Sequence, residues 1–301
     1  MYAAKTHNPA LAAILIAVAC AFIAATTLIA KTLASTQFGE PLHPFQVVFG
    51  RFFFAFLTFA VVAAVLRPDL QRPHLGLHLA RTLGGWAGLT LMFASVAYIP
   101  LADATAISFL NPVFGMIFAI PLLGERVGKW RWSAAVIALV GAVILLRPTP
   151  DSFQPGALFA LAAAVILGFE LNIIKKLTGR ENPFSILLVN NAIGVVIASL
   201  AVVWVWIWPT PMQWALMAAL GCAMAVAQTC FVNAMARADA SFVAPLTYGT
   251  LIFAAVYDIL FYNVIPDGVT ILGASSIVAG ALLLAWREAM QTKPKHDHAP
   301  L

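Results

Sequence analysis

The chain of 301 residues is 62% hydrophobic and only 10% charged, whereas soluble domains are about 25% charged. Its 17 basic and 12 acidic residues give a net charge of +5. They are too few to cover the water-facing surface of a soluble protein of this length. This composition excludes soluble enzymes and nucleic-acid-binding proteins. It indicates an integral membrane protein whose main partner is the lipid bilayer.

Ten apolar runs are long enough to cross the bilayer as helices, which need about 20 residues each. Short connectors with Pro, Gly and charged residues separate them, so no connector can hold a soluble domain. The first run is longer than a secretion signal, and we expect it to be retained. The predicted fold is an all-α integral membrane protein with ten transmembrane helices, at 9–33, 44–66, 76–98, 103–123, 131–147, 156–177, 184–208, 212–235, 240–262 and 268–286.

The basic residues indicate which side of the membrane each loop occupies, because Lys and Arg next to spans are retained in the cytoplasm. One set of alternate loops contains Arg147 alone. The other set contains Lys5, Arg67, Arg72, Arg126, Lys129, Arg131, Lys175, Lys176, Arg180, Arg237, Arg287, Lys293 and Lys295. We therefore expect both termini to be cytoplasmic in a bacterial-type inner membrane. Trp204, Trp206 and Trp208 then lie at the outer interface.

The two halves of the chain resemble each other in short matches that occur in the same order. His43-Pro44-Phe45-Gln46 resembles Asn182-Pro183-Phe184-Ser185, and Ala102-Asp103-Ala104 matches Ala238-Asp239-Ala240. The matches predict a first five-helix repeat at 1–150, a second at 151–288 and a cytoplasmic polar tail at 289–301. Because each repeat has an odd number of spans, the second enters the membrane from the opposite side. The repeat is therefore inverted.

Inverted repeats can exchange two related conformations, which opens a fixed site near the bilayer midplane first to one side and then to the other. This arrangement favours a transporter that works by alternating access. A passive helix bundle is an alternative, and it predicts polar groups bonded to one another with no cavity between the halves. An intramembrane enzyme acting on lipid-linked substrates is another alternative, which would need a cluster of acids, His or Ser near one membrane face. A homo-oligomer is an open alternative that no sequence feature supports.

Several kinds of functional site have no counterpart in the sequence. Cys20, Cys222 and Cys230 lie inside apolar runs and predict no disulfide. His296 and His298 form the only close histidine pair, in the polar tail, and we expect no metal site. The chain has no Lys-Ser/Thr phosphate loop, zinc-protease motif or nucleophile elbow. ATP hydrolysis is therefore excluded and no cofactor is expected, which leaves a secondary transporter with or without proton exchange.

Three stretches of the first half resemble a known family. They are Tyr98-Ile99-Pro100-Leu101-Ala102-Asp103-Ala104-Thr105-Ala106-Ile107 leading into Asn111-Pro112, then Leu123-Gly124-Glu125-Arg126-Val127, then Gly141-Ala142-Val143-Ile144-Leu145. In this order they resemble the drug/metabolite transporter superfamily, and within it the EamA-type ten-helix permeases, over nearly the whole chain. The resemblance implies export of small metabolites. The aromatic-rich interior is most similar to YddG-like exporters of aromatic and neutral amino acids, with nucleosides and cationic drugs as alternative substrates.

Ionisable and amide groups inside spans are costly, so they are expected to face a wet cavity or one another. Arg51 lies in the second span, and the repeat places Asn190 at the equivalent position of the seventh. Thr26 likewise corresponds to Glu170. We expect these four residues to line a substrate cavity and Glu170 to couple transport to protons. A structural hydrogen-bond network, or for Arg51 a side chain that reaches the outer interface, is the alternative.

Further residues at mid-depth extend the predicted substrate cavity. Trp86, Thr90 and Phe93 are spaced by four and three residues, so they share one helix face that could stack an apolar or aromatic substrate. The other predicted members of the cavity are Asn111, Gln228 and Tyr248. Lipid contact or ordinary helix packing is the alternative for each aromatic residue.

A last set of residues is expected to control helix packing and bending. Pro112 removes one helical hydrogen bond, and Pro245 lies near the start of the ninth span. Gly85 and Gly221 lack side-chain bulk and let helices approach closely. His78 and Arg81, in the first turns of the third span, are expected at the cytoplasmic headgroups.

Overall fold

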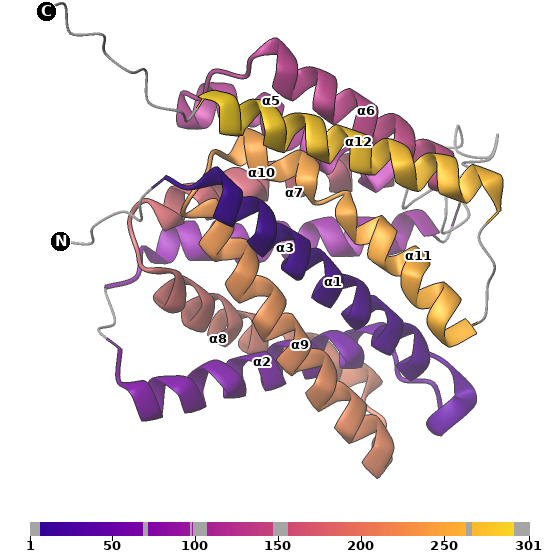
Figure 1. The fold of residues 1–301 in the computed structure, drawn as a ribbon. Coiled ribbons are helices and arrows are strands. Elements are labelled where there is room, and N and C mark those ends of the chain that lie inside the picture. Colours follow the sequence, from indigo (N-terminus) through magenta and orange to yellow (C-terminus); the bar gives the residue numbers. More distant parts are fainter. Residues whose placement is uncertain are drawn as a thin grey trace, which may run out of the picture.

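The protein is described from a computed structural model, which covers residues 7–68, 72–96, 98, 107–146, 156–262 and 267–291. Every regular element in these residues is a helix (Figure 1). The elements are α1 (Pro9–Leu33), η1 (Thr36–Phe38), α2 (Pro44–Leu66), α3 (Leu75–Val96), α5 (Asn111–Leu123), α6 (Lys129–Leu146), α7 (Gly156–Thr178), α8 (Pro183–Val202), η3 (Val203–Val205), α9 (Pro211–Met235), α10 (Ala240–Leu246), α11 (Gly249–Tyr262) and α12 (Gly268–Gln291).

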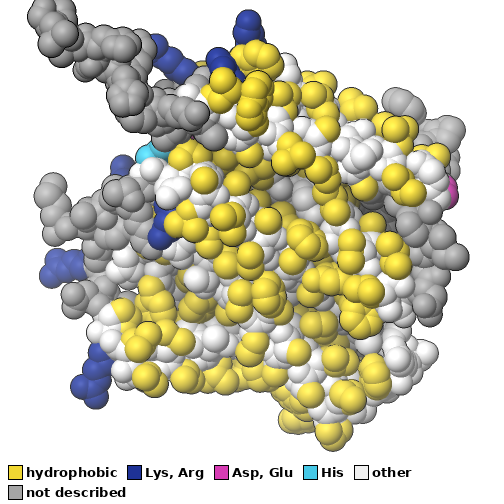
Figure 2. Space-filling model, in the orientation of Figure 1, with side chains coloured by type: hydrophobic (Ala, Val, Ile, Leu, Met, Phe, Trp, Pro, Cys, Tyr) yellow, Lys and Arg dark blue, Asp and Glu magenta, His cyan; other side chains and the backbone are white. Residues whose placement is uncertain are grey.

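The predicted all-helical membrane fold is confirmed. Within the described residues, six helical segments are long and apolar enough to cross a membrane, and two shorter apolar helices accompany them. Residues 103–106 of the predicted fourth span lie outside the described residues. The face shown in Figure 2 is covered by hydrophobic side chains and uncharged groups, and Lys and Arg gather at the end of the molecule where α1 begins and α12 ends. We refer to this end as the basic end.

Two predicted boundaries are wrong, and one span with the predicted ends is interrupted. The seventh span does not run to residue 208, because α8 ends at Val202 and Pro209 disfavours helix in the residue before it. The tenth extends to Gln291, beyond 286 and into the expected polar tail, because its last turns consist of good helix formers. The ninth is not continuous: α10 ends at Leu246 and α11 begins at Gly249.

Proline explains both the starts of several helices and the break in the ninth span. His43 caps α2 before Pro44, and Asn182 caps α8 before Pro183. These two caps are equivalent positions of the repeat, and proline suits the first helical turn because its missing N–H has no partner there. Pro245 instead lies inside α10, where its missing N–H and its ring break the helix within two residues.

The two halves are packed as an inverted pair. α1 packs on α9 as α3 packs on α7, and α1 packs on α11 as α7 packs on α5. The equivalent helices α2 and α8 are antiparallel, because Gln46 near the start of α2 bonds Ile207 beyond the end of α8. Phe59 near the end of α2 correspondingly contacts Phe184 at the start of α8. Since equivalent helices run in opposite directions, the halves are related by a two-fold axis across the helices, as an inverted repeat requires.

Candidate functional site

One face of α3 carries polar side chains into the protein interior. His78, Arg81 and Thr82 are all buried, with 0%, 4% and 4% of their surface exposed. His78 and Arg81, expected at the cytoplasmic headgroups, therefore face neighbouring helices and not lipid, and their depth in the membrane stays a prediction. α3 packs against α7 and α8, which cover this face and keep it away from lipid. The face leads from the basic end toward the middle of the molecule.

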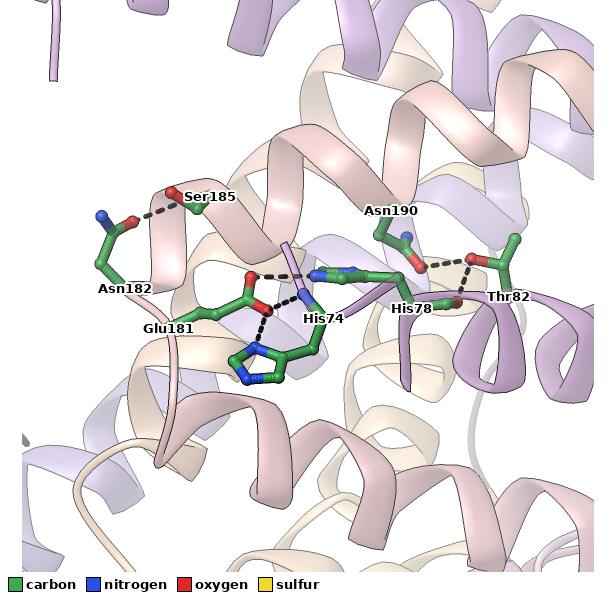
Figure 3. A network of polar contacts seen from close by, with 7 residues as sticks. All are labelled: His74, His78, Thr82, Glu181, Asn182, Ser185 and Asn190. Carbon is green, nitrogen blue, oxygen red and sulfur yellow. Dashed lines mark hydrogen bonds and ion pairs between the residues drawn. The ribbon is translucent and has the colours of Figure 1, made fainter. Parts of the chain in front are cut away.

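At the basic end, the polar face of α3 is joined to the α7–α8 loop through Glu181 (Figure 3). The carboxylate of Glu181 is fully buried and accepts hydrogen bonds from the backbone N–H of His74 at 2.7 Å and from its Nδ1 at 2.9 Å. Its other oxygen accepts from Nε2 of His78, also at 2.9 Å. Burial acts to raise the pKa of Glu181, but these hydrogen bonds outweigh it and hold the pKa below the ordinary carboxylate value. Glu181 therefore acts as a charged acceptor that ties the two halves together.

One turn farther along α3, amide and hydroxyl groups bond across the halves. Thr82 Oγ1 lies 2.9 Å from the His78 carbonyl and 3.2 Å from Oδ1 of Asn190 on α8 (Figure 3). On the same helix, the side-chain amide of Asn191 donates to Oε1 of Gln228 on α9 at 2.9 Å. The predicted cavity residues Asn190 and Gln228 thus take part in interhelical hydrogen bonds, across the halves for Asn190 and within the second half for Gln228. For Asn190 this is the structural alternative stated above.

Deeper still, three charged side chains come together from three helices. Nε of Arg81 on α3 lies 3.9 Å from Oε1 of Glu170 on α7. Arg51 on α2 is near enough that its charge acts on both of these residues. Arg81 and Glu170 have 5% and 20% of their side chains exposed. The predicted site residues Arg51 and Glu170 are therefore neighbours, and Arg81 joins them.

Several buried donor atoms of this cluster lack hydrogen-bond partners among the described residues. Among the described residues, no partner is present for the buried Nε of Arg51, for Nε and Nη1 of Arg81, or for Nε1 of Trp86. The guanidinium of Arg51 lies 5.1 Å from the ring centre of Phe52, and the Trp86 ring lies 6.3 Å from that of Phe45. The cluster thus combines unsatisfied cationic donors with an aromatic wall.

Gly85 leaves room for the carboxylate of Glu170 in the charged cluster. A Cβ atom at Gly85 would lie 3.4 Å from Oε2 and 3.5 Å from Oε1 of Glu170. The expected role of this glycine in close helix approach therefore becomes more specific, since it accommodates a carboxylate. Gly221 has the role of a packing residue: a Cβ there would lie 2.4 Å from Cβ of Phe54 and 2.9 Å from the backbone nitrogen of Ala55.

The structure separates other predicted residues from the charged cluster. Thr26 is buried and its hydroxyl donates to the Ile23 carbonyl of its own helix at 2.7 Å. Thr90 is exposed on the outside of α3. The side chain of Phe93 lies outside the description. The structure thus does not bring Thr90 into contact with the charged cluster beside Trp86.

Two predictions about the broken helices are corrected. Asn111 is half-buried and begins α5, so Pro112 lies in the first turn, where it removes no helical hydrogen bond. Tyr248 has none of its surface exposed, and its hydroxyl donates to the Phe109 carbonyl at 2.6 Å. Tyr248 therefore does not line a water-accessible space in this conformation. It links the turn in the ninth span to the residues that precede α5.

Sequence reasoning missed three residues of these networks: Arg81, His78 and Glu181. A signal was present, since His74, His78 and Arg81 follow one another at intervals of four and three residues and so share a helix face. Glu181 lies in a short loop among basic residues, and no pattern in the sequence indicates that it is buried. Only the packing of the α7–α8 loop on α3 shows this.

Comparisons with known proteins agree with this architecture. An S-adenosylmethionine uptake transporter of Rickettsia bellii is 30% identical over 262 residues, which cover 86% of this chain and 89% of the relative. A pseudopaline exporter of Pseudomonas aeruginosa is 27% identical over 219 residues, covering 72% of this chain and 77% of the relative. A solved crystal structure has the same fold, with a TM-score of 0.78 at 19% identity, and covers 94% of this chain and 99% of its own.

The EamA-like transporter family matches the chain twice, at residues 10–147 and 154–286. The two matched segments coincide with the two halves that pack as an inverted pair. The relatives are transporters of small metabolites, with both an uptake protein and an exporter among them. The chain belongs to the EamA-like transporter family, within the drug/metabolite transporter superfamily.

Proposed function

We propose that this protein is a secondary transporter that exports aromatic or neutral amino acids and related small metabolites by alternating access. Membership of a family of small-metabolite transporters supports transport over the alternative of an intramembrane enzyme. The direction is part of the proposal, because the relatives include proteins of both directions. The positions of the basic residues support an orientation with both termini in the cytoplasm of a bacterial cell.

The observation that carries the proposal is the cluster of Arg51, Arg81 and Glu170 between the halves. Arg51 and Arg81 belong to the first half, and Glu170 belongs to the second. A charged side chain in the middle of a membrane costs about 2.5–3.5 kcal/mol on insertion scales, and such residues usually mark a transport pathway. A site built from both halves is what alternating access requires, since movement of one half on the other changes the side from which the site is reached.

The chemistry of the cluster fits a zwitterion with an apolar body. The guanidinium groups can receive a carboxylate, and Glu170 can receive an ammonium group. Phe52 lies against the Arg51 guanidinium, and Trp86 packs in the same hydrophobic cluster as Phe52, so an aromatic surface is available there. An aromatic or neutral amino acid has all three features. We further propose Glu170 as the proton-coupling residue, because it is the acidic member of the cluster and keeps 20% of its side chain exposed.

Contacts between the two halves close the basic end and must separate before a substrate can pass there. Glu181 of the second half binds His74 and His78 of the first. Arg131 of the first half binds Asp239 of the second at 2.9 Å. Release of substrate toward this end requires these cross-half contacts to separate, and release toward the opposite end requires the same of the Gln46–Ile207 and Gln213–Glu40 hydrogen bonds.

The proposal is tested with the full chain in proteoliposomes, loaded with labelled amino acids, nucleosides or cationic drugs, with and without a pH gradient. We expect aromatic and neutral amino acids to move fastest. Empty liposomes and liposomes with heat-inactivated protein are the controls. Absence of protein-dependent flux for every compound would overturn the proposed function, and flux of nucleosides or drugs alone would overturn the substrate assignment.

A further inference from the structure

The charged cluster contains more hydrogen-bond donors than its own acceptor can satisfy. Nε and Nη1 of Arg81 and Nε of Arg51 are buried without hydrogen-bond partners among the described residues, and so is Nε1 of Trp86. Guanidinium groups are always charged, so the N–H groups of Arg51 and Arg81 do not lose their protons and remain hydrogen-bond donors. Buried polar groups in folded proteins are normally paired, and unpaired ones call for an explanation.

Glu170 does not supply that pairing. Its Oε1 atom is 3.9 Å from Nε of Arg81, which is beyond hydrogen-bond distance although the opposite charges attract. Its carboxylate lies instead against Gly85, at 3.4–3.5 Å from the position of a Cβ atom there. The two guanidinium groups and one carboxylate leave a net charge of +1 in the cluster. One further anion would balance the charge and could accept the free N–H groups.

We propose that Arg51 and Arg81 form a seat for the carboxylate of the transported substrate, with the indole N–H of Trp86 as an additional donor. This inference rests on the proposed function and specifies the substrate class as small carboxylates with an apolar or aromatic body. The planar fork of a guanidinium matches a carboxylate, with two parallel hydrogen bonds. Because the seat includes two cations, a cationic substrate without a carboxylate is repelled as well as left without hydrogen bonds there.

The neighbouring residues set where the rest of the substrate lies. Trp86 occupies the next turn of α3 after Arg81, and its ring is packed near Phe45 of α2. The Phe52 ring lies 5.1 Å from the Arg51 guanidinium, and Phe52 packs in the same hydrophobic cluster as Trp86. An apolar body therefore meets aromatic rings next to the carboxylate seat, whereas an ammonium group is directed to Glu170.

The experiment compares matched ligands that share one apolar body and differ in whether they carry a carboxylate, an ammonium group or both. For the phenyl body these are phenylalanine, 3-phenylpropionate and phenethylamine, and for the branched body leucine, 4-methylpentanoate and isopentylamine. Binding to the purified full chain is read from the rise in its unfolding temperature, and transport from flux in proteoliposomes. We expect both carboxylate-bearing members of each set to bind about 10- to 100-fold more tightly than the amine, as the loss of charge-assisted hydrogen bonds implies.

Variants then assign the effect to the cluster. Arg81→Gln and Arg51→Gln should each reduce the preference for carboxylate over amine by about 10-fold or more, and Arg81→Lys should retain part of it because the charge remains without the fork. The matched control is Arg180→Gln, since Arg180 is exposed in the α7–α8 loop. If a glutamine variant does not fold, the ligand series on the unaltered protein still decides.

The outcomes separate this inference from the proposed function. If carboxylates raise the unfolding temperature but no compound is transported, the carboxylate seat is supported and the proposed transport function is overturned. Equal flux of phenylalanine and phenethylamine would overturn the seat and leave transport standing. An unchanged preference in a folded Arg81→Gln variant would also overturn the seat. If no ligand binds and none moves, both proposals fall.

Discussion

Nε2 of His78 lies 2.9 Å from the buried carboxylate of Glu181, and this contact joins α3 of the first half to the α7–α8 loop of the second (Figure 3). A change of Glu181 to Gln removes the charge and leaves one oxygen to serve three N–H donors. We expect Glu181→Gln to lower the free energy of unfolding by about 1–3 kcal/mol, the cost of a lost charged hydrogen bond. Thermal unfolding in detergent measures it, with Glu40→Gln as the control because Glu40 is exposed. Equal stability of the two variants would contradict a tie between the halves.

The contribution of Glu181 also has a defined pH dependence. Burial acts to raise its pKa, but the hydrogen bonds from His74 and His78 lower it overall, so folding favours the ionised form. Its stabilisation is therefore present above the ordinary value of 4.5 and is lost as the pH falls through the lowered pKa. The stability difference between the unaltered protein and Glu181→Gln should persist at pH 5 and shrink at lower pH. A difference that grew below pH 4.5 would have the wrong sign.

Two glycines should respond differently to the same added methyl group. Gly221→Ala places a Cβ at 2.4 Å from Phe54 and 2.9 Å from the backbone of α2, so α9 must move. We expect a loss of about 1–3 kcal/mol in the free energy of unfolding. Gly85→Ala meets only ordinary contacts at 3.4 Å and should fold normally, whereas Gly85→Val should displace Glu170 and reduce transport. Gly76→Val is the control, since nothing lies within 4 Å of its Cβ position.

Replacement of Glu170 by Gln tests its role in coupling. Gln keeps the shape and the contact with Gly85 but cannot exchange a proton. We expect the pH dependence of transport to disappear, while binding of 3-phenylpropionate, which carries no ammonium group for Glu170, is largely retained. Flux across a range of pH gradients, together with ligand-induced stabilisation at one pH, measures the two effects separately. A pH dependence that is unchanged in Glu170→Gln would remove its proposed role.

Trp86→Ala tests whether the indole contacts the substrate. Trp86 follows Arg81 by five residues on α3, and its ring lies 6.3 Å from that of Phe45. We expect an aromatic substrate to lose more affinity than a small aliphatic one, by about 0.5–1.5 kcal/mol, the size of an aromatic pair interaction. Competition flux with phenylalanine and alanine measures the difference. The same loss for both substrates would indicate that Trp86 only packs between helices.

The length of the apolar runs predicts the helices, because lipid requires backbone polar groups to be paired within each span. The order of the repeated matches, with an odd number of spans in each half, predicts the inverted arrangement. Arg51 and Glu170 could be selected as ionisable residues inside apolar runs. Arg81 and His78 were assigned to the headgroups because distance from a loop does not reveal that α7 and α8 cover this face. Tyr248 was misplaced for a related reason, since its hydrogen bond to Phe109 depends on a break that periodicity does not show.

The central claim is that two oppositely inserted halves open a shared site to one side at a time. Spin-label distances test it on one protein with its native cysteines replaced. One label pair, Arg72→Cys with Arg180→Cys, spans the halves at the basic end, and the other, Gln37→Cys with Met212→Cys, spans them at the opposite end; all four positions are exposed. In membranes with substrate, we expect one distance to lengthen as the other shortens. Two distances that stay fixed, or that lengthen together, would contradict alternating access.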